Sequence, residues 1–493
     1  MKNHILAIDQ GTTSTRAVLF NSLGKVVASH SVPLTQHYPQ PGWVEHDPGQ
    51  IWQSTLRCLN GVLRGRKIQV AGIGITNQRE TTLLWDRQTG KPLHRAIVWQ
   101  DRRTAPDCAR LKRAGRENSV RERTGLVLDP YFSGTKLAWV LNNVPGARAK
   151  ARAGRLAFGT VDSWLIWNLT GGKVHATDPT NASRTMLFNI RKREWDPTMA
   201  KMLGIPPGLL PEVRNSSGRF GTTISLGALP AGVPITGVAG DQQAALFGQG
   251  CVHPGGMKVT YGTGGFLLVH AGSTPGIPHN GLLTTLACGP RGEPAYALEG
   301  AVFIAGAVMQ WLRDELGLIK TSPEAEKISR SVRDSGGVYI VPAFTGLGAP
   351  WWDADARGII TGLTRGSGRA QLVRAAEESI AYQVADVVSA MEKGLGKRIT
   401  ELRVDGGACR DSFLMQFQAD ILNARILRPR LVETTVAGAA HLAGLGTGLW
   451  SPARLAGLHA MDRKFLPRMK PAVRNRLLRG WHTAVSRARS KPA

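Results

Sequence analysis

Cysteine is scarce in this sequence, and long apolar runs are missing from it. The 493 residues include five cysteines, which form no CxxC pair and no other metal-binding spacing. We therefore expect reduced thiols rather than a disulfide framework or a cysteine-rich metal centre. No apolar stretch approaches the roughly 20 residues of a membrane helix, and the short polar N-terminus differs from a signal peptide. The sequence thus predicts a cytoplasmic protein without a membrane span.

Acidic residues are also few, with 35 Asp and Glu against 62 Lys and Arg, so the formal net charge is +27. Much of the excess lies from Ser451 to Ala493, and a second basic region runs from Arg102 to Arg155. Such charge attracts nucleotides, phosphorylated products or RNA alike. Aromatic residues make up only 6% of the chain and are not interleaved with the basic runs. Since no nucleic-acid module is recognisable either, we expect a solvated basic surface and no specific nucleic-acid partner.

Two common phosphate-binding motifs, GxxxxGK[ST] and GxGxxG, do not occur. The first 20 residues contain instead a short apolar strand, Ile5 to Ile8, a polar tip, Asp9 to Thr15, and a second strand, Arg16 to Phe20. Small side chains and backbone N–H groups at such a tip can surround an anion. Asp9 places a carboxylate where a phosphate-bound Mg²⁺ needs an oxygen ligand. This pattern is typical of actin-like ATPases, although a Gly-Thr turn in an unrelated sheet remains an alternative.

The same pattern returns in the second half of the chain. Met257 to Val269 reads as a strand, a Gly-Thr-Gly-Gly tip and another strand. Two such halves facing each other could hold the phosphates of one nucleotide from both sides. The length suggests several domains, and 42% hydrophobic with 20% charged residues is typical of a globular enzyme. We predict an α/β fold with one domain over residues 1–252 and another over 253–493.

Polar residues follow two predicted strands at the end where open α/β sheets bind ligands. Arg79 and Glu80 come shortly after the strand Val70 to Thr76, and together they can donate to and accept from polyol hydroxyls. An ordinary surface ion pair is the alternative. Asp241 follows the strand Pro234 to Ala239 at the start of a helix. The helix dipole favours its ionised form, which can accept a proton, although simple helix capping would explain it equally.

Taken together, nine segments of the chain resemble the carbohydrate kinases that include glycerol kinase, and the resemblance covers nearly its whole length. The segments are AIDQGTTSTR, GITNQRETT, WQDRRT, DPYFSGTK, TNASRTMLFN, GDQQAALFGQ, YGTGGF, LRVDGG and LMQFQADI. The resemblance implies two actin-like, ribonuclease H-like domains that close over a central cleft. It also implies ATP and Mg²⁺ as cofactors and glycerol as the substrate, in the first step of glycerol catabolism. We expect a homo-oligomer, either a dimer or a tetramer.

The resemblance assigns roles to individual positions of this chain. Residues expected to contact the nucleotide are Thr12, Thr13, Ser14, Arg16, Thr263, Gly306, Gln310, Gly407 and Asp411. Residues expected to bind glycerol hydroxyls are Arg79, Glu80, Tyr131, Asp241 and Gln242, while Trp99 and Phe266 line its carbon side. Asp241 is the expected catalytic base, and Asp9 and Asp241 are the expected metal ligands.

The chain departs from the family pattern at two places. Arg410-Asp411-Ser412 stands where the family commonly has Asn near the adenine. Ala231-Gly232-Val233 lacks the Arg that some bacterial members carry in a sugar-phosphate regulatory loop, so that form of inhibition is not expected here. The alternatives to glycerol phosphorylation are a kinase for another small polyol or ketose, a non-catalytic actin-like ATPase and a basic RNA-binding protein.

Overall fold

The computed structural model describes residues 3–490, apart from 276–280, 354 and 431–432. Strands in the first half are β1 (His4–Gln10), β2 (Ser14–Asn21), β3 (Val26–Pro33), β4 (Glu45–His46), β5 (Val70–Asn77), β6 (Leu83–Asp86), β7 (Ala96–Ile97), β8 (Leu156–Gly159), β9 (Ala176–Thr177), β10 (Phe188–Asn189), β11 (Glu194–Trp195), β12 (Glu212–Val213) and β13 (Ile235–Gly240). Helices there are α1 (Pro48–Leu63), α2 (Ala105–Arg113), α3 (Glu117–Thr124), α4 (Ser133–Asn143), α5 (Ala147–Arg152), α6 (Val161–Leu169), α7 (Pro179–Ala182), α8 (Pro197–Leu203), the 3₁₀ helix η1 (Pro207–Leu209) and α9 (Asp241–Gly248).

The second half continues with a further set of strands and helices. Its strands are β14 (Met257–Tyr261), β15 (Gly265–Gly272), β16 (Leu283–Cys288), β17 (Pro294–Val302), β18 (Tyr339–Val341), β19 (Ile359–Thr361), β20 (Glu401–Gly406), β21 (Arg425–Pro429) and β22 (Met461–Phe465). Its helices are α10 (Gly306–Asp314), α11 (Ser322–Arg330), α12 (Arg369–Leu395), the 3₁₀ helix η2 (Gly407–Arg410), α13 (Ser412–Leu422), α14 (Thr434–Gly446), α15 (Pro452–Ala456) and α16 (Pro471–Ala488).

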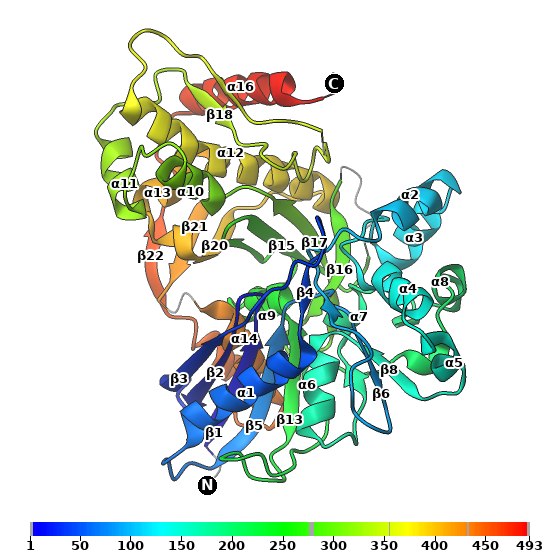
Figure 1. Ribbon diagram of the computed structural model, residues 1–493. Coiled ribbons are helices and arrows are strands. Elements are labelled where there is room, and N and C mark those ends of the chain that lie inside the picture. Colours follow the sequence, from blue (N-terminus) through cyan, green and yellow to red (C-terminus); the bar gives the residue numbers. More distant parts are fainter. Residues whose placement is uncertain (1–2, 276–280, 354, 431–432, 491–493) are drawn as a thin grey trace.

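Figure 1 shows two lobes, each built on a sheet, with helices α2 to α5 and α8 grouped at the side of the first lobe. The sheet of the first lobe has the order β13-β5-β1-β2-β3. Strands β1 and β2 form the predicted antiparallel hairpin, while β5 and β13 run parallel to β1. The parallel strands are nearly continuous buried runs, as expected for a sheet that helices cover on both faces.

The second sheet repeats this topology with different residues. Its order is β16-β17-β15-β14-β20-β21-β22. The antiparallel hairpin β14–β15 takes the place of β1–β2, and β20 and β21 run parallel to β14 as β5 and β13 do to β1. The predicted internal duplication is therefore visible in strand order and direction, although the two sequences share little beyond their Gly-Thr tips.

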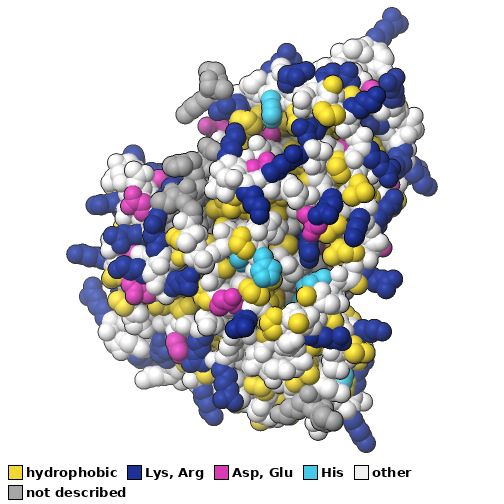
Figure 2. All heavy atoms as spheres, turned by 180° about the vertical axis from the view of Figure 1, so that it is seen from behind, with side chains coloured by type: hydrophobic (Ala, Val, Ile, Leu, Met, Phe, Trp, Pro, Cys, Tyr) yellow, Lys and Arg dark blue, Asp and Glu magenta, His cyan; other side chains and the backbone are white. Residues whose placement is uncertain are grey.

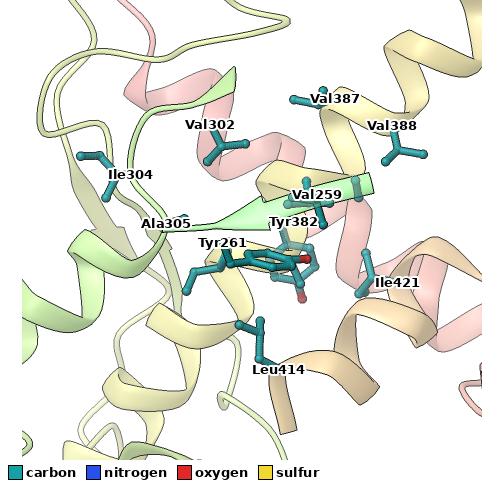
Figure 3. Packing of buried hydrophobic residues seen from close by; sticks show 14 of the residues in the cluster. Val259, Tyr261, Val302, Ile304, Ala305, Tyr382, Val387, Val388, Leu414 and Ile421 are labelled. Carbon is teal, nitrogen blue, oxygen red and sulfur yellow. The ribbon is translucent and has the colours of Figure 1, made fainter. Parts of the chain in front are cut away.

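Helix α12 provides much of the core of the second lobe. Its apolar residues recur at the helical spacing, and most are buried where the helix packs against α11, α13, β15 and β17. Figure 3 shows Tyr382 of this helix beside Tyr261 of β14, and Leu414 and Ile421 of α13 belong to the same cluster. Tyr382 also stacks on Trp481 of α16, with ring centroids 5.2 Å apart. Helix α16, which lies within the basic C-terminal region, is thus docked on the second lobe.

One helix crosses between the lobes. Although α14 follows β21 of the second sheet in sequence, it packs against β1, β5 and β13 of the first sheet and against α9. The packing is close, because a Cβ atom on Gly438 would lie 1.8 Å from the carbonyl oxygen of Ala244. The division of the chain at residues 252 and 253 stays a prediction, and the first lobe includes a helix from the far side of that boundary.

Local signals in the sequence agree with the element ends. Asp47 caps α1, with its carboxylate accepting the backbone N–H of Gly49 at 2.7 Å, and Pro48 occupies the first turn. Strand β7 ends at Ile97, so Trp99 lies in the segment that follows the strand. Within the described part of the chain, none of the helices has the length and apolar character needed to span a membrane. Figure 2 shows Lys and Arg side chains spread over one whole face rather than gathered in one strip.

Candidate functional site

The tip of the first hairpin lies at the carboxyl end of β1 and β5, next to the residues that follow β5. The backbone N–H of Gly11 bonds the carbonyl of Ser14 at 2.9 Å, which closes the turn. Thr12, Thr13 and Ser14 are at least partly exposed at this tip. The indole N–H of Trp99 donates to the hydroxyl of Thr12 at 2.9 Å. This bond joins the predicted phosphate hairpin to the predicted glycerol wall.

Arg79 lies at the centre of a buried charge network. Its Nε is 3.2 Å from Oδ1 of Asp241, and its two terminal nitrogens lie 2.6 and 3.1 Å from the carboxylate oxygens of Glu299. Its Nη2 also lies 3.4 Å from the hydroxyl of Tyr131. Arg79 and Glu80 are only 2% and 1% exposed and stand 3.8 Å apart. The alternative of an ordinary surface ion pair is therefore wrong.

Glu80 has a strained backbone and a firmly held carboxylate. Its φ of +61° is in the left-handed region, which non-glycine residues occupy rarely and often at functional sites. The Nε of Arg184 donates to its Oε1 at 2.6 Å. The ammonium of Lys136 donates to the Tyr131 carbonyl at 2.7 Å and lies 3.4 Å from the carbonyl of Glu80. Burial lowers the pKa of Lys136 to about 7, although neighbouring carboxylates favour its charge.

Three aromatic rings stand beside these charges. The ring of Trp99 lies 5.7 Å from that of Tyr131 and 6.5 Å from that of Phe266, in both cases edge to face. Phe266 belongs to β15 of the second lobe, whereas Trp99 and Tyr131 belong to the first. The structure therefore brings together Trp99 and Phe266, which were predicted to line the carbon side of glycerol, and Tyr131, which was predicted to bind its hydroxyls.

Two carboxylates, Asp9 and Asp241, lie close enough to affect each other. Burial raises the pKa of Asp241 to about 6, and the positive charge of Arg79 opposes that shift. Burial and the charge of Asp241 raise the pKa of Asp9 to about 7, while Arg16 opposes. The predicted helix position of Asp241 is confirmed, because it is the first residue of α9. The capping alternative is wrong, since the cap is Gly240, and the Asp241 carboxylate, besides its contact with Arg79, accepts the N–H of the next residue, Gln242, at 2.6 Å rather than one two or three residues further on.

The predicted nucleotide residues of the second half also lie near one another. The N–H of Gly306 bonds the carbonyl of Gly262 at 2.9 Å, and the N–H of Ala305 bonds the carbonyl of Thr263 at 2.9 Å. Gln310 lies one turn further along α10 on the same side of the helix. At the end of β20 the chain approaches Tyr261 so closely that a Cβ atom on Gly406 would lie 2.3 Å from its carbonyl oxygen. This contact brings Gly407, in η2, to the hairpin tip.

Arg16 and Asp411 have protein partners of their own. Arg16 forms an ion pair with Glu433, just before α14. Asp411 caps α13, accepting the N–H of Leu414 at 2.9 Å. Burial raises the pKa of Asp411, and Glu377 of α12 interacts with it. An Asn at this position could cap the helix equally well, so capping does not explain the difference from the family pattern.

Family models match both halves of the chain. Residues 4–248 match the N-terminal domain of the FGGY family of carbohydrate kinases, and residues 257–447 match its C-terminal domain. The chain belongs to the FGGY family of carbohydrate kinases. The predicted resemblance and the predicted α/β fold of two related domains are confirmed.

Relatives of this FGGY kinase include glycerol kinases from several bacteria. The chain is 57% identical to the glycerol kinase of Symbiobacterium thermophilum over 492 residues, with 99% of each chain covered. It is also 57% identical to glycerol kinase 2 of Pseudomonas aeruginosa, covering 99% of this chain and 97% of the other. The crystal structure of Plasmodium falciparum glycerol kinase with ADP superposes with a TM-score of 0.94 at 37% identity, covering 99% and 98% of the two chains.

Four charged residues in the site of this FGGY kinase were not assigned from the sequence. They are Lys136, Arg184, Lys258 and Glu299, and each is at most 2% exposed. Glu299 and Lys258 each interrupt an otherwise apolar strand, which is a signal that sequence reasoning could have used. Arg184 and Lys136 lie inside two of the family-like segments, TNASRTMLFN and DPYFSGTK.

A separate surface cavity of about 680 Å³ lies on the outer side of the second lobe, and no predicted site residue lines it. Its walls come mainly from α12, α16 and the end of α13. The chemistry predicted for this FGGY kinase is thus concentrated where the two lobes meet, around Arg79 and Asp241.

Proposed function

We propose that this protein transfers the γ-phosphoryl group of ATP to a terminal hydroxyl of glycerol, giving sn-glycerol 3-phosphate and ADP. The observation that carries the proposal is the position of Asp241. Its carboxylate is 3.2 Å from the guanidinium of Arg79, and it interacts electrostatically with Asp9 beside the first phosphate hairpin. A proton acceptor, a polyol-binding cation and a phosphate loop therefore meet at one place.

The acceptor alcohol is bound by groups that match its two sides. Arg79, Glu80, Tyr131 and Gln242 offer hydrogen-bond donors and acceptors to the hydroxyls. The rings of Trp99 and Phe266 pack against the carbon side and limit the length of the chain that fits. This combination of a polar face and an apolar wall selects a short polyol.

Asp241 acts as the base that removes the proton from the attacking hydroxyl. Its pKa of about 6 leaves it mostly ionised at pH 7, yet basic enough to accept a proton as the bond to phosphorus forms. Apart from this proton acceptor, phosphoryl transfer requires that the two reactants are positioned and that the charge on the phosphoryl group is stabilised. The two hairpin tips supply backbone N–H groups for the phosphates, and Gly306, Gln310 and Gly407 lie on the nucleotide side. Contact between the lobes excludes water, which would compete with glycerol.

Asp9 and Asp241 fit a Mg²⁺ ion that arrives with the nucleotide. The charge of Asp241 raises the pKa of its neighbour Asp9, and two such neighbouring carboxylates would offer a divalent cation the oxygen ligands that it prefers. Such an ion neutralises charge on the phosphates when it is bound. Within the described residues no group of three or more His, Cys, Asp or Glu side chains is placed to hold a metal by itself, in agreement with an ion held partly by the substrate.

The substrate is tested by ADP release with glycerol, erythritol, xylulose or buffer alone. Glycerol should give the highest kcat/KM, because additional carbons meet Trp99 and Phe266. A higher value for erythritol or xylulose would identify the alternative, a kinase for another polyol or ketose. A salt-sensitive RNA complex without any acceptor-dependent ADP release would favour the RNA-binding alternative.

The base is tested by Asp241→Asn, which keeps the shape but cannot accept the proton. We expect turnover to fall by at least about 10³-fold while ATP still binds. Glu194→Gln, at an exposed position on β11, is the matched control. Turnover of the Asp241→Asn variant close to that of the unmodified protein would exclude Asp241 as the catalytic base. A cytoplasmic location and a dimeric or tetrameric state stay predictions from the sequence.

A further inference from the structure

Lys258 is a fully buried lysine on β14, where the second lobe meets the first. Its ammonium donates to the hydroxyl of Thr260 at 2.8 Å, to the carbonyl of Phe266 at 3.4 Å and to Oε1 of Gln242. The first two partners belong to its own hairpin. Gln242 belongs to α9 of the first lobe, so the third bond crosses between the lobes.

The bond to Lys258 decides which way the Gln242 side chain faces. An ammonium group has three donors and no acceptor, so it can bond only the amide oxygen and never the amide nitrogen. The Nε2 of Gln242 is therefore directed away from Lys258. Among the described residues that nitrogen has no hydrogen-bond partner, and Gln242 itself is partly exposed.

The charges around Lys258 come from three other elements and one loop. Its ammonium is attracted by Asp405 on β20, Asp241 on α9 and Glu299 on β17, and is repelled by Arg79 after β5. Burial outweighs these carboxylates and lowers the pKa of Lys258 to about 8, and the neutral amide of Gln242 adds no charge that could offset this. Charge balance therefore does not explain the hydrogen bond between Lys258 and Gln242, and this bond needs another explanation.

We propose that Lys258 is a positioning residue for the acceptor alcohol: by binding the oxygen of Gln242 from the opposite lobe, it presents the amide N–H₂ to an alcohol oxygen. This inference rests on the proposed function, because it concerns the same substrate site. It makes acceptor recognition depend on a residue of the lobe that carries the second hairpin.

The central experiment is steady-state kinetics of Lys258→Met, which keeps most of the side-chain volume and removes the donors. We expect the KM for glycerol to rise about tenfold or more, as for loss of a charge-assisted hydrogen bond, with the KM for ATP within twofold. Lys397→Met makes the same change at an exposed position of the same lobe and should alter neither value. Equal increases in both KM values for Lys258→Met would overturn the proposal.

A double-mutant cycle tests whether Lys258 acts through Gln242. In a Gln242→Ala background, Lys258→Met should raise the KM for glycerol by less than about twofold, since the amide that it orients is gone. Thr260→Val removes another partner of the ammonium and should leave glycerol binding unchanged. A full tenfold increase in the Gln242→Ala background would show that Lys258 acts by another route.

A second measurement uses the unmodified protein and so does not depend on the folding of a variant. Side-chain amide NMR signals of glutamine-labelled protein, with Gln242 assigned by its loss in Gln242→Ala, should shift when glycerol is added without nucleotide. An unmoved Gln242 signal at saturating glycerol would overturn the proposal. If the unmodified protein turns over a different polyol of the panel, the proposed function fails, and the same variants and signals then test Lys258 with that alcohol.

Discussion

Arg79 of the first lobe and Glu299 of the second lobe form a two-point ion pair, with Nη1–Oε2 and Nη2–Oε1 distances of 2.6 and 3.1 Å. Arg184 adds a third bond to the Glu299 carboxylate at 2.9 Å. Burial alone would raise the pKa of Glu299, but the two guanidinium groups outweigh it and lower the pKa to about 2. The predicted acceptor-binding arginine is therefore oriented by a residue of the opposite lobe.

Glu299→Gln should destabilise the protein and weaken glycerol binding. The change leaves two buried guanidinium groups with one carboxylate fewer, and breaking a buried pair typically costs about 3–5 kcal/mol. We expect a free energy of unfolding lower by that order in urea titration and a KM for glycerol raised at least about tenfold. Glu194→Gln, whose exposed partner Lys192 is 3.8 Å away, should change stability by less than about 0.5 kcal/mol. A similar small effect for Glu299→Gln would contradict the prediction.

Trp99→Phe should affect ATP more than glycerol. Phenylalanine keeps an aromatic wall for the substrate but loses the N–H that bonds the Thr12 hydroxyl at 2.9 Å. We expect the KM for ATP to rise by about three- to tenfold and the KM for glycerol to stay within about threefold. In the double variant Trp99→Phe/Thr12→Val the two effects on ATP should be less than additive. Fully additive effects would show that the bond does not position Thr12.

Activity should decline in mild acid. The pKa of Asp241 is raised to about 6, so its ionised form is lost as the pH falls through that value. Protonation of Asp9, with a pKa of about 7, adds to the loss. We therefore expect kcat/KM for glycerol to fall by at least about tenfold for each pH unit below 6, with the decline beginning near pH 7, measured by ADP release between pH 5 and 8. A flat profile down to pH 5 would exclude an ionised Asp241 as the required form.

Glu377→Gln should stabilise the protein at alkaline pH. Burial and the charge of Asp411 raise the pKa of Glu377 from 4.5 to about 9. Since the folded state holds this proton more tightly than the unfolded chain, stability falls as the pH rises between those values. The amide has no proton to lose, so we expect a gain of at least about 1 kcal/mol at pH 8 and a smaller gain at pH 5. Thermal unfolding at the two pH values measures this, with Glu315→Gln as the exposed control. Equal gains at both pH values would contradict the ionisation argument.

The hairpins and the position of Asp241 could be predicted because their signals are local. Alternating apolar residues, a Gly-Thr tip and a strand followed by a helix start are all visible within about ten residues. A charge within an apolar strand marks Glu299 as unusual, but its partners could not be predicted, because they depend on two strand pairings and on a contact with the other lobe. The same holds for α14, whose packing surface lies almost 200 residues earlier at Ala244. The positions of Glu299 and α14 depend on contacts between segments that are distant in the sequence, and local sequence patterns do not reveal such contacts.

The crossing of α14 has a consequence for how the protein is made. Ribosomes release a chain from its N-terminus, so the strands of the first sheet emerge long before residues 434–446 do. Until then the face of that sheet which α14 covers stays exposed to water. The nascent first lobe therefore stays incomplete while most of the second is synthesised, and a fragment ending at residue 252 would expose apolar surface that invites chaperones or aggregation.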